Sequence, residues 1–316
     1  MRIDFLEMIN FRNMKAQRIS FEGKSFVVLI GDNGSGKTAI LEAITKAFVP
    51  VLRTVNSEAM KASDLSNNDI RFGSNGVAVK IGITLDNEKY VWTNKRRLSS
   101  QIPFEEGIET SEQNDLKVLK NVYASHVEKQ ALPLVLYYGT DRIIREVPQR
   151  GHIKNFSVTD ALRNCFDNVD YFRDFYDWFK TEEDIELREL RNNKNYQNVR
   201  LNSVRSAIER MIRGYSNLRI ELAPSRMLLT NEQGIDLQVD QLIDELDLHL
   251  HPKWQKTIVD ELKRTFPNCQ FIISTHSPFI IQSLKAEELY DISEMKYADE
   301  CGNYNGWSID TIQEHL

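Results

Sequence analysis

The sequence predicts an α/β protein with three parts: a mixed or parallel sheet core that carries a glycine-rich loop, an antiparallel β subdomain and a helical insertion. Three observations favour this fold class. The apolar run at residues 25–30 leads into the stretch GDNGSGKT and then into a helical pattern. Alternating strand patterns surround this unit. A block of helical periodicity interrupts those strands between residues 158 and 213.

The first half of the chain is predicted to consist mainly of strands. Alternating or continuous apolar patterns predict strands at residues 2–11, 18–21, 25–30, 77–85, 89–93 and 133–138. The last of these, PLVLYY, has the continuous apolar character of a buried strand. Asp86 and Asn87 separate two of the strands and indicate a hairpin turn.

The second half is predicted to begin with a compact helical lobe, because residues 158–213 sustain no heptads. Further strands are expected at residues 218–223, 227–230, 235–239 and 269–275, the last one buried. Helices are expected at residues 253–266 and after Pro278, which lies in a first turn. The predicted domains are residues 1–157, 158–213 and 214–316.

Composition limits the classes of protein to consider. A chain of 316 residues with 41% hydrophobic residues can form about two domains, and its net charge of −6 argues against wholesale coating of nucleic acid. Three cysteines without CxxC spacing indicate a reduced, cytoplasmic setting. Two basic clusters could contact DNA or simply be solvated loops. They are Lys95, Arg96 and Arg97, and Arg142, Arg145, Arg150, His152 and Lys154.

Residues 31–38 fit the phosphate-binding pattern G-x-x-x-x-G-K-[ST]. The pattern comprises Gly31, Asp32, Asn33, Gly34, Ser35, Gly36, Lys37 and Thr38. Such a loop points backbone N–H groups at a β-phosphate at the positive end of the following helix. Lys37 would reach the β- and γ-phosphate oxygens, and the Thr38 hydroxyl would bind Mg²⁺.

Two adjacent acids and one histidine complete the candidate site. Asp244 is the candidate Mg²⁺ partner, and Glu245 is the candidate to orient or deprotonate the attacking water. The alternative is an acidic strand-to-helix turn. His276 ends the last predicted strand, where it could contact the γ-phosphate, although a lone histidine is more often structural.

The motifs GDNGSGKT, IDELDLHLHPKWQ and FIISTHSP resemble those of ABC-type ATPase heads of the SMC and RecF kind. They resemble more closely the bacterial AAA family ATPases of anti-phage defence in Septu systems and retrons, and LPLVLYYGTDR and GWSIDTIQ extend that similarity. The resemblance implies a P-loop ABC-ATPase head with Asp244 as Walker B aspartate, Glu245 as catalytic glutamate and His276 as switch histidine. Residues 248–252 would face a second subunit. Arg12 and Asn13 match positions near the nucleotide, although a surface Arg-Asn turn is the alternative.

The resemblance also implies a function and partners. The expected protein binds ATP and Mg²⁺, hydrolyses ATP slowly, and forms a homodimer or higher oligomer through its heads. It would control an HNH-type (PtuB-like) effector nuclease, with nucleic acid, either retron msDNA or DNA, as a further ligand and no membrane partner. The alternative is a RecF/SMC-like DNA repair ATPase that binds duplex DNA.

One part of the expected head is missing from the sequence. A signature motif of the type L-S-x-G-[DEQ]-[KR] and its helix should separate LQVDQL from IDEL, yet the two stretches adjoin. We therefore expect a missing segment between Leu242 and Ile243, and a missing helical tail after Leu316. The alternative is a natural head without a signature, which binds ATP without hydrolysing it between two subunits.

Overall fold

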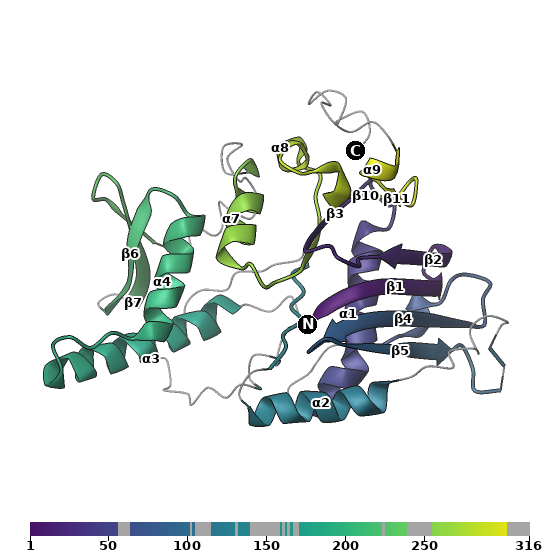
Figure 1. The fold of residues 1–316 in the computed structure, drawn as a ribbon, viewed down its shortest axis with the longest axis horizontal. Helices are drawn as coiled ribbons and strands as arrows, with labels where there is room; N and C mark the ends of the chain where they lie inside the picture. Colours follow the sequence, from purple (N-terminus) through teal and green to yellow (C-terminus); the bar gives the residue numbers. More distant parts are fainter. Residues whose placement is uncertain are drawn as a thin grey trace. The chain divides into compact units, whose positions relative to one another are not determined.

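The computed structural model describes residues 1–55, 64–101, 103–104, 115–129, 132–139, 159, 162, 165–166, 171–222, 225–238 and 255–301. The chain divides into two compact units. The first contains residues 1–139, 157–167 and 268–316, and the second contains residues 140–156 and 168–267. The C-terminal stretch thus belongs to the same unit as the glycine-rich loop, and the helical block belongs to the other (Figure 1).

The first unit contains an antiparallel sheet with the strand order β2-β1-β4-β5. Its strands are β1 (Arg2–Phe11), β2 (Met14–Ser20), β4 (Gly76–Leu85) and β5 (Glu88–Arg97). Asp86 and Asn87 join β4 to β5 with φ angles of 52° and 67°. A two-residue type I′ hairpin needs this left-handed pair, which Asp and Asn tolerate. The predicted hairpin is confirmed.

A second sheet of the same unit has the order β11-β10-β3-β9. Its strands are β3 (Phe26–Ile30), β9 (Phe271–Ser274), β10 (Leu289–Asp291) and β11 (Lys296–Tyr297). Both β10 and β9 run parallel to β3, whereas β11 is antiparallel to β10. Every residue of β3 is buried, as its apolar sequence predicts. The predicted mixed sheet core and antiparallel subdomain are therefore both present.

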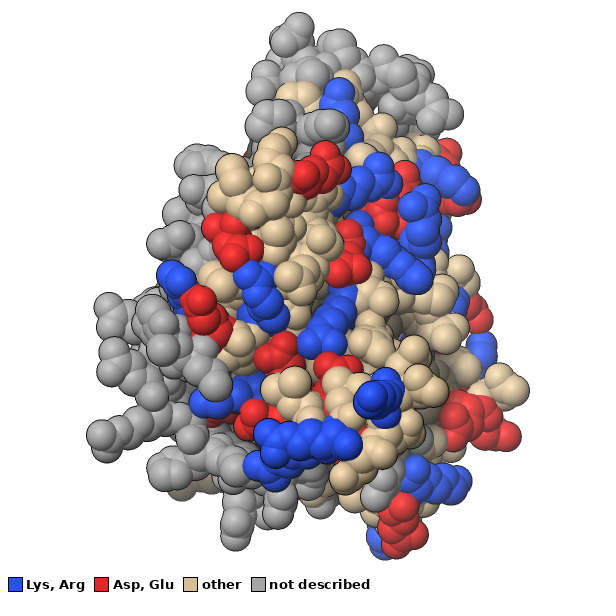
Figure 2. Space-filling view, turned by 90° about the vertical axis from the view of Figure 1, so that its left-hand side faces the viewer, with Lys and Arg blue, Asp and Glu red and all other residues tan. Residues whose placement is uncertain are grey.

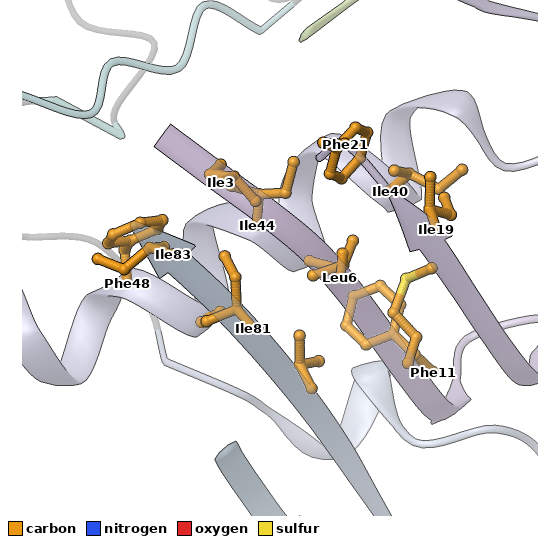
Figure 3. Close-up of a cluster of buried hydrophobic side chains, with 14 of the residues drawn as sticks. Ile3, Leu6, Phe11, Ile19, Phe21, Ile40, Ile44, Phe48, Ile81 and Ile83 are labelled. Carbon is orange, nitrogen blue, oxygen red and sulfur yellow. The ribbon is translucent and has the colours of Figure 1, made fainter. Parts of the chain in front are cut away.

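Helix α1 (Lys37–Val55) and the inner face of the antiparallel sheet bury a common core (Figure 3). Ile81 and Ile83 of β4 lie near Ile44 and Phe48 of α1, and all four side chains are buried. Trp92 of β5 donates from Nε1 to the carbonyl oxygen of Ala47 at 2.8 Å. Helix α2 (Leu116–Glu128) packs against α1 and β5. These contacts fix α1, and with it the loop that precedes its first turn.

The described part of the second unit contains three helices and a small antiparallel sheet. Its elements are α3 (Tyr171–Asn192), α4 (Val199–Met211), β6 (Tyr215–Leu222), β7 (Ser225–Asn231), β8 (Asp236–Gln238) and α7 (Ile258–Thr265). Phe179, Leu201 and Leu229 are fully buried in its core. Acidic and basic side chains are interspersed on the face shown in Figure 2. Both α3 and α4 lie within the predicted helical block, and the three predicted strands are confirmed.

Two predictions about buried strands are wrong. Residues 132–139 form no strand, and the side chains of Leu134, Leu136 and Tyr138 are exposed by 48%, 48% and 59%. Val135 still packs against the core, so the segment is covered on one side, whereas a buried strand needs cover on both. Strand β9 does form, but its apolar residues are only partly buried. Its one neighbour among the described strands is β3, which leaves β9 at the edge of the sheet there.

The remaining predictions concern the C-terminal helices, the cysteines and the membrane. Helix α7 begins later than predicted, and α8 (Pro278–Gln282) has Pro278 at its first position, as predicted. Cys165 and Cys269 are the cysteines whose side chains the structure describes, and neither forms a disulfide. Within the described ranges, no helix combines the length and the apolar character required to cross a membrane.

Candidate functional site

The glycine-rich loop lies between the carboxyl end of β3 and the first turn of α1. Gly36 has a φ of 109°, which L-residues rarely adopt. A Cβ at this position would lie 2.5 Å from Met14 Cε and 3.8 Å from Asn13 Oδ1. The backbone conformation therefore requires glycine, and the missing side chain also leaves room for the Met14 methyl group and the β1–β2 turn. The sequence predicted the first of these but not the second.

Lys37 is buried and folds back over the loop. Its Nζ donates to the carbonyl oxygens of Gly31 at 2.5 Å and Asp32 at 2.9 Å. Burial lowers the pKa of Lys37, and the nearby Asp32 carboxylate opposes that shift. An ammonium group has three donors, so one remains for an anion at the mouth of the loop.

Two hydroxyl groups of the loop complete a cradle for an anion. Ser35 Oγ is buried and has no hydrogen-bond partner among the described residues. Thr38 is exposed in the first turn of α1, where backbone N–H groups have no intrahelical partner. An orphaned hydroxyl, free helix N–H groups and a buried ammonium together fit the phosphate groups of a nucleotide.

His276 lies at the same edge of the sheet. It follows β9, whose Ser274 pairs with Leu29 of β3, the strand that leads into the loop. Partial burial and then the positive charge of Lys37 lower the pKa of His276, so the imidazole is neutral at pH 7. Lys37 follows β3 and His276 follows β9, so both residues come after the carboxyl ends of two neighbouring parallel strands.

Arg12 and Asn13 occupy the β1–β2 turn but have different surroundings. The Arg12 guanidinium contacts Asp69 at 3.3 Å and forms an ion pair with Glu42 of α1. Its charge is therefore balanced inside the protein. Asn13 is exposed, and its amide lies beside Gly36. Of the two predicted residues, Asn13 is the one next to the loop. No spacing in the sequence marks Asp69 or Glu42 as partners of Arg12.

The two predicted acids fall outside the described residues. These are Asp244 and Glu245, together with the predicted discontinuity between Leu242 and Ile243 and the turn at residues 248–252. The described site therefore consists of the loop, Thr38, Asn13 and His276. The roles of Asp244 and Glu245 remain predictions.

Family models match most of the chain. A model described as an AAA domain matches residues 6–215, and a second AAA-domain model matches residues 242–282. The first match includes the loop and the helical block, and the second includes Asp244, Glu245 and His276.

Several curated proteins are similar over most of this chain. The retron Vc95 probable ATPase of Vibrio cholerae is 24% identical over 389 aligned positions, covering 94% of this chain and 74% of the relative. The retron Ec83 probable ATPase of Escherichia coli is 21% identical and covers 92% of this chain and 71% of the relative. A Septu protein PtuA of Bacillus mycoides is 25% identical over 89% of this chain, which spans 39% of that protein.

Two further comparisons concern length and solved structures. The alignment to the Vc95 protein has 389 positions and this chain has 316 residues, so the relative contains segments with no counterpart here. Among solved structures, an SMC head domain from Thermotoga maritima matches with a TM-score of 0.47 and 13% identity. That match covers 92% of this chain and 94% of the other.

Proposed function

Because the chain belongs to the AAA-domain family of ATPases, we propose that it is a regulatory ABC-type head in anti-phage defence. It binds ATP with Mg²⁺ at residues 31–38, hydrolyses ATP slowly and thereby controls a separate effector nuclease of the HNH type. Relatives named as retron and Septu proteins support the defence role. One observation carries the nucleotide site: the Nζ of buried Lys37 donates to two carbonyl oxygens of the loop that also contains the orphaned Ser35 hydroxyl.

In the proposed complex, this chain's residues bind and orient the triphosphate. The loop N–H groups and the free donor of Lys37 hold the β- and γ-phosphates. Mg²⁺, when bound, neutralises charge on these phosphates, and Thr38 and Asp244 are the residues to hold it. Asn13, next to Gly36, lies where it can contact the nucleotide from the β1–β2 turn.

The proposed hydrolysis uses one base and one neutral donor. Glu245 accepts a proton from the attacking water and orients it toward the γ-phosphorus. His276, neutral at pH 7, donates a hydrogen bond to the γ-phosphate oxygen on which negative charge accumulates. Binding of the same triphosphate by a second copy would close a dimer in the cytoplasm.

The test combines the chain with the nuclease encoded beside it. We expect the parental pair to show ATP-dependent nuclease regulation, and we expect Glu245→Gln to bind ATP, accumulate as a dimer in light scattering and lock the nuclease in one state. If this chain alone cleaved DNA and Glu245→Gln abolished that cleavage, the proposal that a separate nuclease cleaves the DNA would be wrong. The alternative, a repair ATPase, requires ATP-dependent duplex binding and no nuclease partner.

A further inference from the structure

The antiparallel sheet has an outer face opposite the side that packs on α1 (Figure 1). Side chains alternate along each strand, so the neighbours of the buried residues Leu6, Ile81 and Trp92 point outward. The strand register aligns these outward residues in rows across the sheet. They are Phe5, Gly82 and Val91 in one row, Glu7, Lys80 and Thr93 in the next, Ile9, Ala78 and Lys95 in the third, and Gly76 with Arg97 at the end.

Two phenylalanine rings lie on this outer face, each over a glycine of β4. A Cβ on Gly82 would lie 2.3 Å from the Phe5 ring, and a Cβ on Gly76 would lie 2.8 Å from the Phe104 ring. Any larger residue at either position would displace the ring. The two glycines are six residues apart along β4, so the rings mark two places about 20 Å apart.

Each ring is accompanied by cations. Arg18 Cζ lies 4.1 Å from the centroid of Phe5. Arg97 Cζ lies 4.5 Å and Lys95 Nζ 5.1 Å from the centroid of Phe104. Such cation–aromatic pairs provide planar surfaces on which a base can stack.

Most of the cations on this face have no carboxylate partner among the described residues. Lys80, Lys95 and Arg97 form no ion pair with any residue in the described part of the chain. Arg18 pairs with Glu7 at 3.4 Å, but its side chain is 60% exposed. The second unit differs, because Arg205, Arg219 and Arg226 each contact a carboxylate there. Arg96, predicted with this cluster, lies in the inward row and donates to Asn67 Oδ1.

A shallow groove of about 230 Å³ opens beside Phe5 and is lined by Arg18, Tyr90 and Val91. Two carboxylates in the groove already have partners: Thr84 donates to Asp4, and Lys89 donates to Glu22. The groove therefore has aromatic and apolar walls and charges of both signs: Arg18 and Lys89 are its cations, and Asp4 and Glu22 are its carboxylates.

We propose that this outer face binds single-stranded nucleic acid. Lys80, Lys95 and Arg97 contact phosphates, while Phe5 and Phe104 with their cations stack against unpaired bases. Partly exposed rings with cations beside them suit single strands, whose bases are free to stack, better than a duplex, whose bases are already stacked. The inference does not rest on the proposed control of a nuclease, since it uses only the sheet.

The test is binding of fluorescent oligonucleotides by the full chain, measured by anisotropy at about 50 mM and about 200 mM salt. Probes are oligothymidylate, oligouridylate and a duplex of equal length. The charge reversal Lys95→Glu/Arg97→Glu is compared with Lys117→Glu/Lys129→Glu, which gives the same change in net charge at two exposed lysines, one in the first turn of α2 and one directly after its end.

We expect the parental chain and the α2 control to bind single strands more tightly than the duplex. The sheet variant should lose at least about 1.4 from the slope of log K against log salt, about 0.7 for each lost phosphate contact. Its ATP affinity should match the parental value, which separates this result from any failure of the nucleotide site. Equal losses in both variants, tighter duplex binding, or no binding by the parental chain would each overturn the proposal.

A second measurement uses only the parental protein and therefore needs no folded variant. An oligonucleotide carrying bromouracil should crosslink to Phe5, Phe104 or their neighbours in the parental protein when irradiated, and mass spectrometry locates the attachment. Crosslinks confined to other surfaces of the chain would also overturn the proposal.

Discussion

Lys37 allows the nucleotide site to be tested by one substitution. Lys37→Met removes the ammonium group and keeps most of the apolar stem. Two of the three ammonium donors already bond to the carbonyl oxygens of Gly31 and Asp32, so one remains for a phosphate oxygen. A hydrogen bond to a charged group contributes about 1.5–3 kcal/mol. The expected loss is therefore roughly 10- to 150-fold in the Kd for ATP, before any Coulomb attraction at longer range.

The measurement is calorimetric titration of ATP, together with thermal unfolding of the nucleotide-free protein. Lys37→Met also removes two hydrogen bonds inside the loop, each contributing about 0.5–1.5 kcal/mol, so a modest drop in Tm is expected. Lys117→Met, at an exposed position of α2, controls for the general effect of losing a lysine. An unchanged Kd in a folded Lys37→Met protein would show that the loop is structural only.

Four other predictions follow from the same geometry. Glu245→Gln should leave ATP affinity intact and slow hydrolysis by roughly 10²-fold or more, the effect of losing a general base; a parental rate would place the base elsewhere. The pKa of His276 is lowered in the free protein, so its neutrality stabilises the fold above about pH 6.5 and this contribution is lost as pH falls through the lowered pKa. Bound phosphates should raise that pKa again, so ATP affinity should increase from pH 7 to 6 more in the parental protein than in His276→Gln. Gly36→Ala should cost about 1–3 kcal/mol in denaturant unfolding and weaken ATP binding, because alanine strains the positive φ. Arg12→Ala should cost about 1–3 kcal/mol by leaving the buried Asp69 carboxylate short of a partner; weaker ATP binding at unchanged stability would instead place Arg12 at the nucleotide.

The residue types in a short stretch of sequence predicted those parts of the fold that depend only on residues adjacent in the chain. The β4–β5 hairpin follows from Asp86 and Asn87, whose side chains tolerate left-handed backbone. Strand β3 follows from five consecutive apolar residues before a glycine. The loop pattern likewise fixes its own backbone, because only glycine adopts the φ of Gly36 without strain.

Contacts between distant segments could not be predicted in this way. Residues 133–138 have the composition of a buried strand, but composition does not reveal how many layers cover a segment. The Arg12 network joins the β1–β2 turn, α1 and the short 3-10 helix that ends at Asp69, three segments that no spacing relates. The outer face of the antiparallel sheet also depends on register, since Phe104 meets Gly76 only after β4 and β5 have paired.

The described strands before and after the predicted discontinuity between Leu242 and Ile243 are β8 and β9. Strand β9 is apolar yet only partly buried, and among the described strands it pairs with β3 alone. The two matching family models leave residues 216–241 between them, and the Vc95 relative has segments without a counterpart here.

A missing segment that includes most of the strand before Asp244 stays a prediction. Digestion of the protein expressed from its native gene provides the test, because the sequence has no Lys or Arg between Arg226 and Lys253. With a segment missing, trypsin should release no peptide that runs from Met227 to Lys253. Recovery of that peptide with its expected mass would prove the chain continuous at Leu242 and Ile243. The protein would then be a head without its own signature motif, and ATP hydrolysis between two copies of it would lose its structural basis.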